Sequence, residues 1–145
     1  MTAVDIERVL RELISPDKGT VLIEESQFGP VIFVEPKKST SARLTFNVSA
    51  DDSEVAGTIG ISTPIEVAAN QSRYSSLTGL AEFTIIARTV VMVGFVEKVW
   101  WQWGRTTKSE ATILLENRPV TIRNSTIWRV PFYTSSVIEV KHEPY

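Results

Sequence analysis

The change in hydrophobic period near Thr20 is the feature that most constrains how this chain folds. Before it, apolar side chains recur at the spacing of a single stripe along a helix, at Ile6, Val9, Leu10 and Leu13. After it, apolar residues come in short β-branched runs separated by turn residues, a pattern typical of strands. The sequence therefore predicts an N-terminal helix followed by a largely β chain.

Both ends of the N-terminal helix carry signals. Thr2 and Asp5 have the spacing of a helix cap, in which the Asp side chain reaches back to the first free amides. Ser15-Pro16 and Gly19 are helix-breaking residues. We expect the helix to lie between these two signals.

Short runs beyond residue 20 predict a series of strands. Leu44, Phe46 and Val48 alternate with polar residues, so one face of that strand is buried and the other faces solvent. Residues 51–54, three of which are acidic, precede the next run, which predicts a hairpin. Short joints in the C-terminal third predict an antiparallel meander with successive strands as neighbours. The predicted strands lie at residues 21–23, 31–34, 43–49, 55–61, 95–103, 111–115, 120–122, 127–132 and 137–140.

Residues 77–96 are long and apolar enough to resemble a membrane span. Glu82 and Arg88 lie inside this stretch, and both are costly in a bilayer. Apolar residues at helical spacing compete here with β-branched residues that favour strands. We predict a buried helix, because the stretch is longer than a normal strand and Ser75-Ser76 are suitable capping residues.

Composition bounds the fold class and the class of partner. The chain has 145 residues and no Cys, so it needs a hydrophobic core rather than disulfides. We expect one α+β domain over residues 1–145, a mostly antiparallel curved sheet with an N-terminal helix and a central buried helix. The net charge of −2 provides no basic footprint for phosphate backbones, which argues against a nucleic-acid partner.

The first residues bear on localisation. Residues 1–7 include acids where a secretion signal needs a basic region followed by an apolar run. We therefore expect a cytoplasmic protein that has no membrane partner, in keeping with a chain without Cys.

Catalytic and metal-binding patterns are sparse. His142 is the only histidine and lies three residues from the end, so we expect it to be an exposed tail residue. One histidine without cysteine offers too few ligands for a zinc or iron site. Four scattered carboxylates have no spacing that singles out a catalytic pair: Glu66, Glu82, Glu97 and Glu110. The sequence thus predicts a protein that is not an enzyme and has no cofactor or metal.

The most distinctive segment is the tryptophan-rich stretch at residues 99–105. On a strand, Trp101 and Trp103 would point to one face and Trp100 to the other, so the rings cannot all enter one core. Trp and Arg are enriched at binding hot spots, which makes Trp100, Trp103 and Arg105 a candidate recognition surface. The alternative is that a helix and the C-terminal tail cover both faces and bury the rings.

The C-terminal third also resembles a known family. Residues 94–100, which lead to Trp103-Gly104, together with residues 115–122 and the terminal Glu143-Pro144-Tyr145, resemble patterns in small cytosolic immunity proteins of bacterial toxin systems. The resemblance implies a noncatalytic domain that binds a cognate toxin and blocks its active site or substrate groove. It assigns no binding residue.

Two other classes of function stay open. A self-associating assembly protein would use exposed aromatic surface and sheet edges for contacts between copies, so a homo-oligomer is one alternative. A small-molecule-binding domain would enclose a pocket between sheet and helix. The position of residues 100–105 discriminates between them, because an exposed edge favours a protein partner and a cavity lining favours a ligand.

Overall fold

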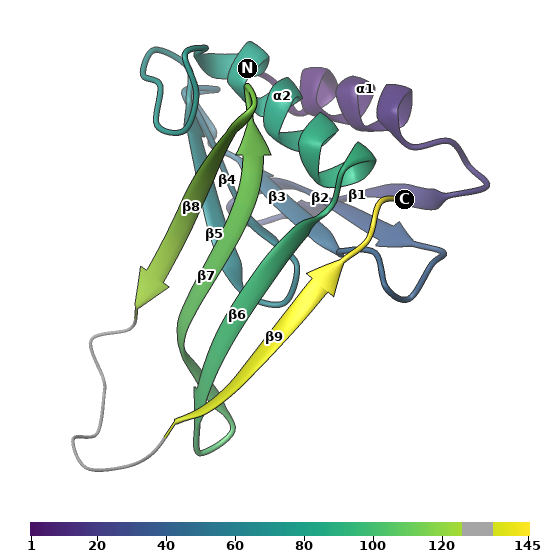
Figure 1. Ribbon diagram of the computed structural model, residues 1–145. Helices are drawn as coiled ribbons and strands as arrows, with labels where there is room; N and C mark the ends of the chain where they lie inside the picture. Colours follow the sequence, from purple (N-terminus) through teal and green to yellow (C-terminus); the bar gives the residue numbers. More distant parts are fainter. Residues whose placement is uncertain (126–134) are drawn as a thin grey trace.

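The computed structural model describes residues 1–125 and 135–145, which form two helices and nine strands (Figure 1). The helices are α1 (Ala3–Leu13) and α2 (Gly79–Met92). The first sheet contains β1 (Gly19–Ser26), β2 (Gly29–Pro36), β3 (Leu44–Val48), β4 (Glu54–Ile59) and β5 (Thr63–Ala68). The second contains β6 (Phe95–Gln102), β7 (Arg105–Leu115), β8 (Arg118–Ser125) and β9 (Ser136–His142). The strand predicted at residues 127–132 lies outside the described residues.

The helix α1 begins as its sequence predicts. The Thr2 hydroxyl accepts a hydrogen bond from the Asp5 amide at 3.2 Å, and the Asp5 carboxylate accepts one from the Thr2 amide at 3.0 Å. This capping box satisfies two amides that would otherwise lack partners. Ile6 and Leu10 are fully buried, so the predicted apolar stripe faces the core.

The segment at residues 77–96 contains the buried helix α2, as predicted. Its cap is different from the expected one, because Thr78 is the N-cap residue and makes no side-chain capping bond. Ser75 lies upstream, and its amide donates instead to the buried Glu82 carboxylate at 2.9 Å. The loop before α2 is therefore held by a carboxylate within the helix.

The first sheet is an antiparallel meander in which strand order follows the sequence. The predicted hairpin between β3 and β4 is confirmed, with Val48 opposite Val55. The strand β5 was not predicted. Among the residues that the structure describes, β5 pairs with β4 alone, and Pro64 is tolerated there because it lies in an edge strand.

The second sheet has the order β8-β7-β6-β9, again antiparallel. The predicted meander holds for β6, β7 and β8. The last strand, β9, instead pairs with β6 on the side away from β7, with His142 opposite Phe95. The strands β7, β8 and β9 are also longer than their apolar runs predicted.

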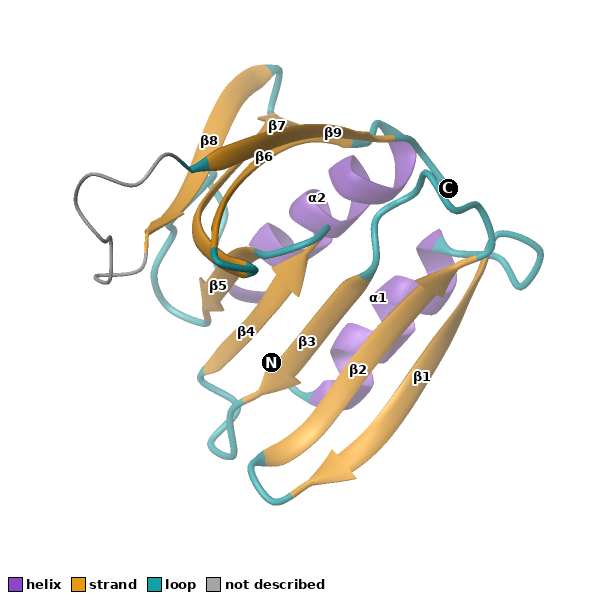
Figure 2. Ribbon diagram, turned by 90° about the horizontal axis from the view of Figure 1, so that it is seen from below, coloured by secondary structure: helices purple, strands orange, loops and turns teal. Residues whose placement is uncertain are grey.

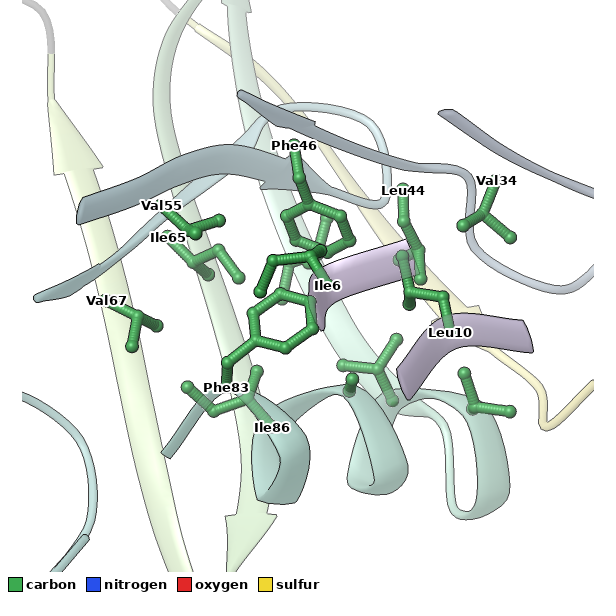
Figure 3. Packing of buried hydrophobic residues seen from close by; sticks show 14 of the residues in the cluster. Ile6, Leu10, Val34, Leu44, Phe46, Val55, Ile65, Val67, Phe83 and Ile86 are labelled. Carbon is green, nitrogen blue, oxygen red and sulfur yellow. The ribbon is translucent and has the colours of Figure 1, made fainter. Parts of the chain in front are cut away.

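Both helices lie side by side and cover one face of the first sheet (Figures 1 and 2). The rings of Phe46 from β3 and Phe83 from α2 meet edge to face at 5.0 Å (Figure 3). The buried cluster includes residues of both helices and both sheets, so the described residues share one core. The α+β class with an N-terminal and a central helix is confirmed. The β6–β7 turn lies at the far end of the second sheet from the helices (Figure 1).

Candidate functional site

The β6–β7 connection is a two-residue turn formed by Trp103 and Gly104. Gln102 and Arg105 are paired across it, and the two turn residues have φ angles of 50° and 73°. Positive φ at both central positions suits the right-handed twist of the flanking strands. Gly adopts this conformation readily, whereas a bulky L residue does so at a cost in backbone energy. Turn chemistry alone would therefore favour Asn or Asp at position 103.

Trp103 is 70% exposed, and Arg105 beside it is also exposed. The expectation that Trp101 and Trp103 share one face of a strand is wrong, because β6 ends at Gln102 and Trp103 lies in the turn. The alternative in which all the rings are buried is likewise wrong for Trp103.

Trp100 lies on β6 and is half-buried. Its neighbour on β7 is Lys108, whose Nζ lies 4.2 Å from the indole centroid in a cation–π contact. The register shifts between Trp100 and Trp101, and the Thr107 hydroxyl donates to the Trp100 carbonyl at 3.2 Å. Such a bulge increases the local twist of a hairpin.

The strand β9 adds exposed apolar side chains to the same end of the sheet. Val137 lies opposite Trp100 and is 52% exposed. We define Trp100, Trp103, Arg105 and Val137 as the hairpin surface. All three residues predicted from the sequence belong to it, and the β6–β7 turn lies beside the start of β9 (Figure 1). The predicted strand at residues 137–140 was the available signal for Val137.

Charges beside the hairpin surface are mainly positive. The Glu110 carboxylate forms ion pairs with Lys108 at 2.6 Å and with Arg123 at 3.2 Å, so one carboxylate faces two cations. The bond from Lys108 lowers the pKa of Glu110 below its ordinary value, so this carboxylate stays ionised at neutral pH. The exposed Arg105 adds a further positive charge.

A second polar cluster is buried between the two sheets. Glu97 of β6 has no exposed surface and accepts four hydrogen bonds, from the amides of Ile61 (2.8 Å) and Ser62 (3.0 Å), the Thr63 hydroxyl (2.8 Å) and His142 Nε2 (2.9 Å). Burial alone would raise the pKa of Glu97, but these donors outweigh it and hold the pKa below its ordinary value. The ionised form of the buried Glu97 carboxylate is therefore stabilised by its hydrogen-bond donors.

His142 is not the exposed tail residue that the sequence suggested. It is 7% exposed, and its ring stacks on Phe95 with centroids 4.5 Å apart. The residues after it are tied down, since the Glu143 amide donates to the Thr40 carbonyl at 3.0 Å and the Tyr145 amide to the Val91 carbonyl at 2.9 Å. Backbone pairing, rather than distance from the end of the chain, determines the rigidity of this residue.

Each of the four scattered carboxylates has partners of its own among the described residues. Glu66 is bridged to Arg73, Glu82 is held by the loop before α2, and Glu110 faces Lys108. Within residues 1–125 and 135–145, no group of three or more His, Asp or Glu side chains is arranged to hold a metal ion.

Comparison with known proteins returned no match to a family model, to a curated protein or to a solved structure. The resemblance to immunity proteins stays a prediction. None of the helices in the described part of the chain has the length and apolar character needed to cross a membrane.

Proposed function

We propose that this chain is a noncatalytic protein-binding domain whose contact residues are those of the hairpin surface. The carrying observation is Trp103, a large indole that is 70% exposed and placed in a turn at a φ angle that disfavours bulky residues. Strained residues of this kind cluster at functional sites. A contact role accounts for a Trp at a position where Asn would form the turn more easily.

The neighbouring side chains support a protein partner. A rigid ring buries much area at little entropic cost, and an adjacent Arg adds charged hydrogen bonds that set orientation. Trp103 and Arg105 supply this combination, and Val137 extends the apolar area. Lys108 and Arg123 share the single carboxylate of Glu110, so together with Arg105 they leave a net positive charge that favours an acidic partner surface.

A role for the hairpin surface in small-molecule binding has less support. Trp100, Trp103 and Arg105 do not line a cleft between the two sheets or three other hollows in the described part of the chain. The exposed position of the turn favours a macromolecular contact, because small ligands need concave sites.

Neutralisation of a toxin is the most specific version of the proposal. Its support is the resemblance of residues 94–104 to immunity proteins, since this stretch contains β6 and the Trp103 turn. A domain of this kind needs only a complementary surface and no catalytic group, which agrees with the carboxylates being engaged by neighbouring groups.

Self-association is the second candidate, and one observation favours it. Among the described residues, β9 pairs only with β6, and Val137 and Ile138 on it are 52% and 42% exposed. Exposed apolar edge strands pair readily with another chain.

A two-step binding experiment tests these alternatives. The tagged domain captures partners from a lysate of the native host, and calorimetry with the purified partner then gives the affinity. We expect Trp103→Asn to weaken binding by about 100-fold and Arg105→Ala by about tenfold, as for central hot-spot residues. Asn suits the turn, so this variant removes the ring without disturbing the hairpin.

Phe28→Ala is the matched control. Phe28 is 73% exposed and precedes β2 in the first sheet, so its loss removes an exposed ring away from the hairpin surface. Equal affinity of wild type and Trp103→Asn would overturn the proposed surface. Capture of the chain itself as the only partner would favour self-association, and a partner without toxic activity would overturn neutralisation.

A further inference from the structure

The strand β1 forms one edge of the first sheet, on the side away from the second sheet (Figure 2). Its eight residues pair with β2 in unbroken register, and no other strand of the described residues pairs with it. The opposite edge strand, β5, is protected by Pro64 and by the Tyr74 hydroxyl, which accepts a hydrogen bond from the Glu66 amide at 3.2 Å. β1 is regular and contains no proline, so its edge is open to pairing with a further strand.

The register shows which backbone groups of β1 point away from β2. The Lys37 amide donates to the Lys18 carbonyl at 2.9 Å, so this pair is hydrogen-bonded across the two strands. Hydrogen-bonded and non-hydrogen-bonded pairs alternate along an antiparallel ladder, which directs the amide and carbonyl groups of Val21, Ile23 and Glu25 outward. No hydrogen bond from the described residues reaches the backbone of Ile23 or Glu25 at the free edge. Their amides and carbonyls are therefore available to an added strand.

Arg11 of α1 supports this orientation. Its guanidinium donates to the Val21 carbonyl at 3.1 Å, as expected for a carbonyl that points to the free edge. The same guanidinium forms an ion pair with Glu7 at 2.7 Å. Arg11 thus occupies the edge at Val21, and the open part of the edge begins at Ile23.

The side chains along the open part of β1 are apolar and acidic. Leu22 and Ile23 lie on opposite faces of the strand and are 46% and 39% exposed. Glu24 and Glu25 follow them, are also exposed, and form no ion pair with the described residues. An added strand would therefore meet apolar side chains with negative charge beside them.

The charge of the first sheet indicates what kind of strand fits this edge. The five strands of the sheet contain five glutamates and no Lys or Arg. A second copy of β1 would bring Glu24 and Glu25 to the edge again, and like charges on neighbouring strands are destabilising. Charge complementarity therefore favours a strand that carries Lys or Arg over a second copy of this chain.

We infer that the β1 edge binds an extended segment of a protein partner in which Lys or Arg alternates with apolar residues. The segment adds a strand to the first sheet, because its backbone pairs with Ile23 and Glu25. Its basic side chains bind the carboxylates of Glu24 and Glu25, and its apolar side chains cover Leu22 and Ile23. This surface goes beyond the proposed function and does not depend on it, since the hairpin surface belongs to the second sheet.

Synthetic peptides test this surface on the intact chain. A short peptide of alternating Val and Lys is titrated into the protein and followed by nuclear magnetic resonance, and the same peptide with Glu in place of Lys is the charge control. We expect saturable shifts of the amides at residues 21–26 with the lysine peptide and none with the glutamate peptide. Hydrogen exchange at the amides of Ile23 and Glu25 should slow by about tenfold at a peptide concentration of about ten times Kd, because the bound amides are closed to solvent.

A modified peptide and two variants separate strand pairing from general attraction between charges. N-methylation at one central Val and one central Lys removes an amide donor from each edge of the peptide and keeps every charge, so binding should weaken by about tenfold. Glu24→Lys should weaken binding of the lysine peptide by a similar factor. Glu139→Lys is the matched control, since Glu139 is also an exposed glutamate of an edge strand and the change in net charge is the same.

Several outcomes would overturn the inference. These are the absence of a saturable shift with the lysine peptide, equal affinity for the lysine and glutamate peptides, and equal affinity for the methylated and unmethylated peptides. Protection of the Ile23 and Glu25 amides that rises with protein concentration in the absence of peptide would mean that a second copy occupies the edge. Trp103→Asn should bind the lysine peptide like wild type, and loss of peptide binding in this variant would place the contact at the hairpin surface instead.

Discussion

Glu97 Oε2 lies 2.9 Å from His142 Nε2, and this buried contact joins neighbouring strands of the second sheet. The same carboxylate accepts hydrogen bonds from the amides of Ile61 and Ser62 in the β4–β5 turn of the first sheet. Glu97 therefore connects the two sheets and the last strand through one side chain. Buried acceptors with several donors are costly to disturb, because each donor loses its partner.

Glu97→Gln is expected to lower the free energy of unfolding by about 2–4 kcal/mol. The Gln side chain has an NH₂ group in place of one acceptor oxygen. This NH₂ group would face hydrogen-bond donors and cannot accept hydrogen bonds from them. Urea unfolding followed by circular dichroism measures the loss. Glu139→Gln is the control, since Glu139 is exposed in its pair with Lys98 and should change stability by less than about 1 kcal/mol. Similar losses in both variants would contradict a structural role for the buried carboxylate.

Acid is expected to weaken the fold partly through Glu97. Its pKa is lower in the folded chain than its ordinary value of about 4.3, so the ionised carboxylate stabilises the fold above that pH. This contribution decreases as the pH falls toward the folded-state pKa. Between about pH 5 and pH 3, wild type should therefore lose more unfolding free energy than Glu97→Gln. Parallel losses in the two proteins, measured by urea unfolding at each pH, would argue against this coupling.

The order of helices and strands was largely predictable because it depends on local periodicity. The stripe through Ile6 and Leu10 and the alternation through Phe46 are visible in the sequence, and both side chains are buried as expected. The strand β5 was missed because Pro64 and Glu66 weaken its β-branched signal. The pairing of β9 with β6 is a contact between distant segments, which local patterns do not encode.

The candidate site was predicted in part, because some of its residues are close in the sequence and others are brought together by contacts between distant segments. Trp100, Trp103 and Arg105 come from one hairpin, so their proximity in the sequence places them near one another in the fold, and their role in binding stays a prediction. The contact between Glu97 and His142 spans 45 residues and depends on the register of β9 against β6. No residue spacing in the sequence predicts such a pair, and a histidine near the end of a chain is usually mobile.

Gly60→Ala is expected to destabilise the protein more than Gly104→Ala. Both glycines have positive φ angles, 68° and 73°, so each substitution incurs a backbone cost of about 1–2 kcal/mol. A Cβ at position 60 would also contact Glu97 Oε2 and lie 2.7 Å from His142 Nε2, whereas a Cβ at position 104 would meet no atom of the described residues within 4 Å. Thermal unfolding should therefore show a larger fall in Tm for Gly60→Ala. Equal falls would mean that the Glu97 and His142 side chains can move aside without loss.

Trp103→Asn is expected to preserve stability, or to raise it by about 0.5–1 kcal/mol, while it removes partner binding. Asn tolerates the φ of 50° at this turn position better than a bulky residue does. The indole is 70% exposed, so little buried area is lost with it. Differential scanning calorimetry measures the stability and isothermal titration with the purified partner measures the binding. A large fall in Tm would instead assign Trp103 to the packing of the fold, and weaker binding by this variant would then carry no evidence for a contact surface.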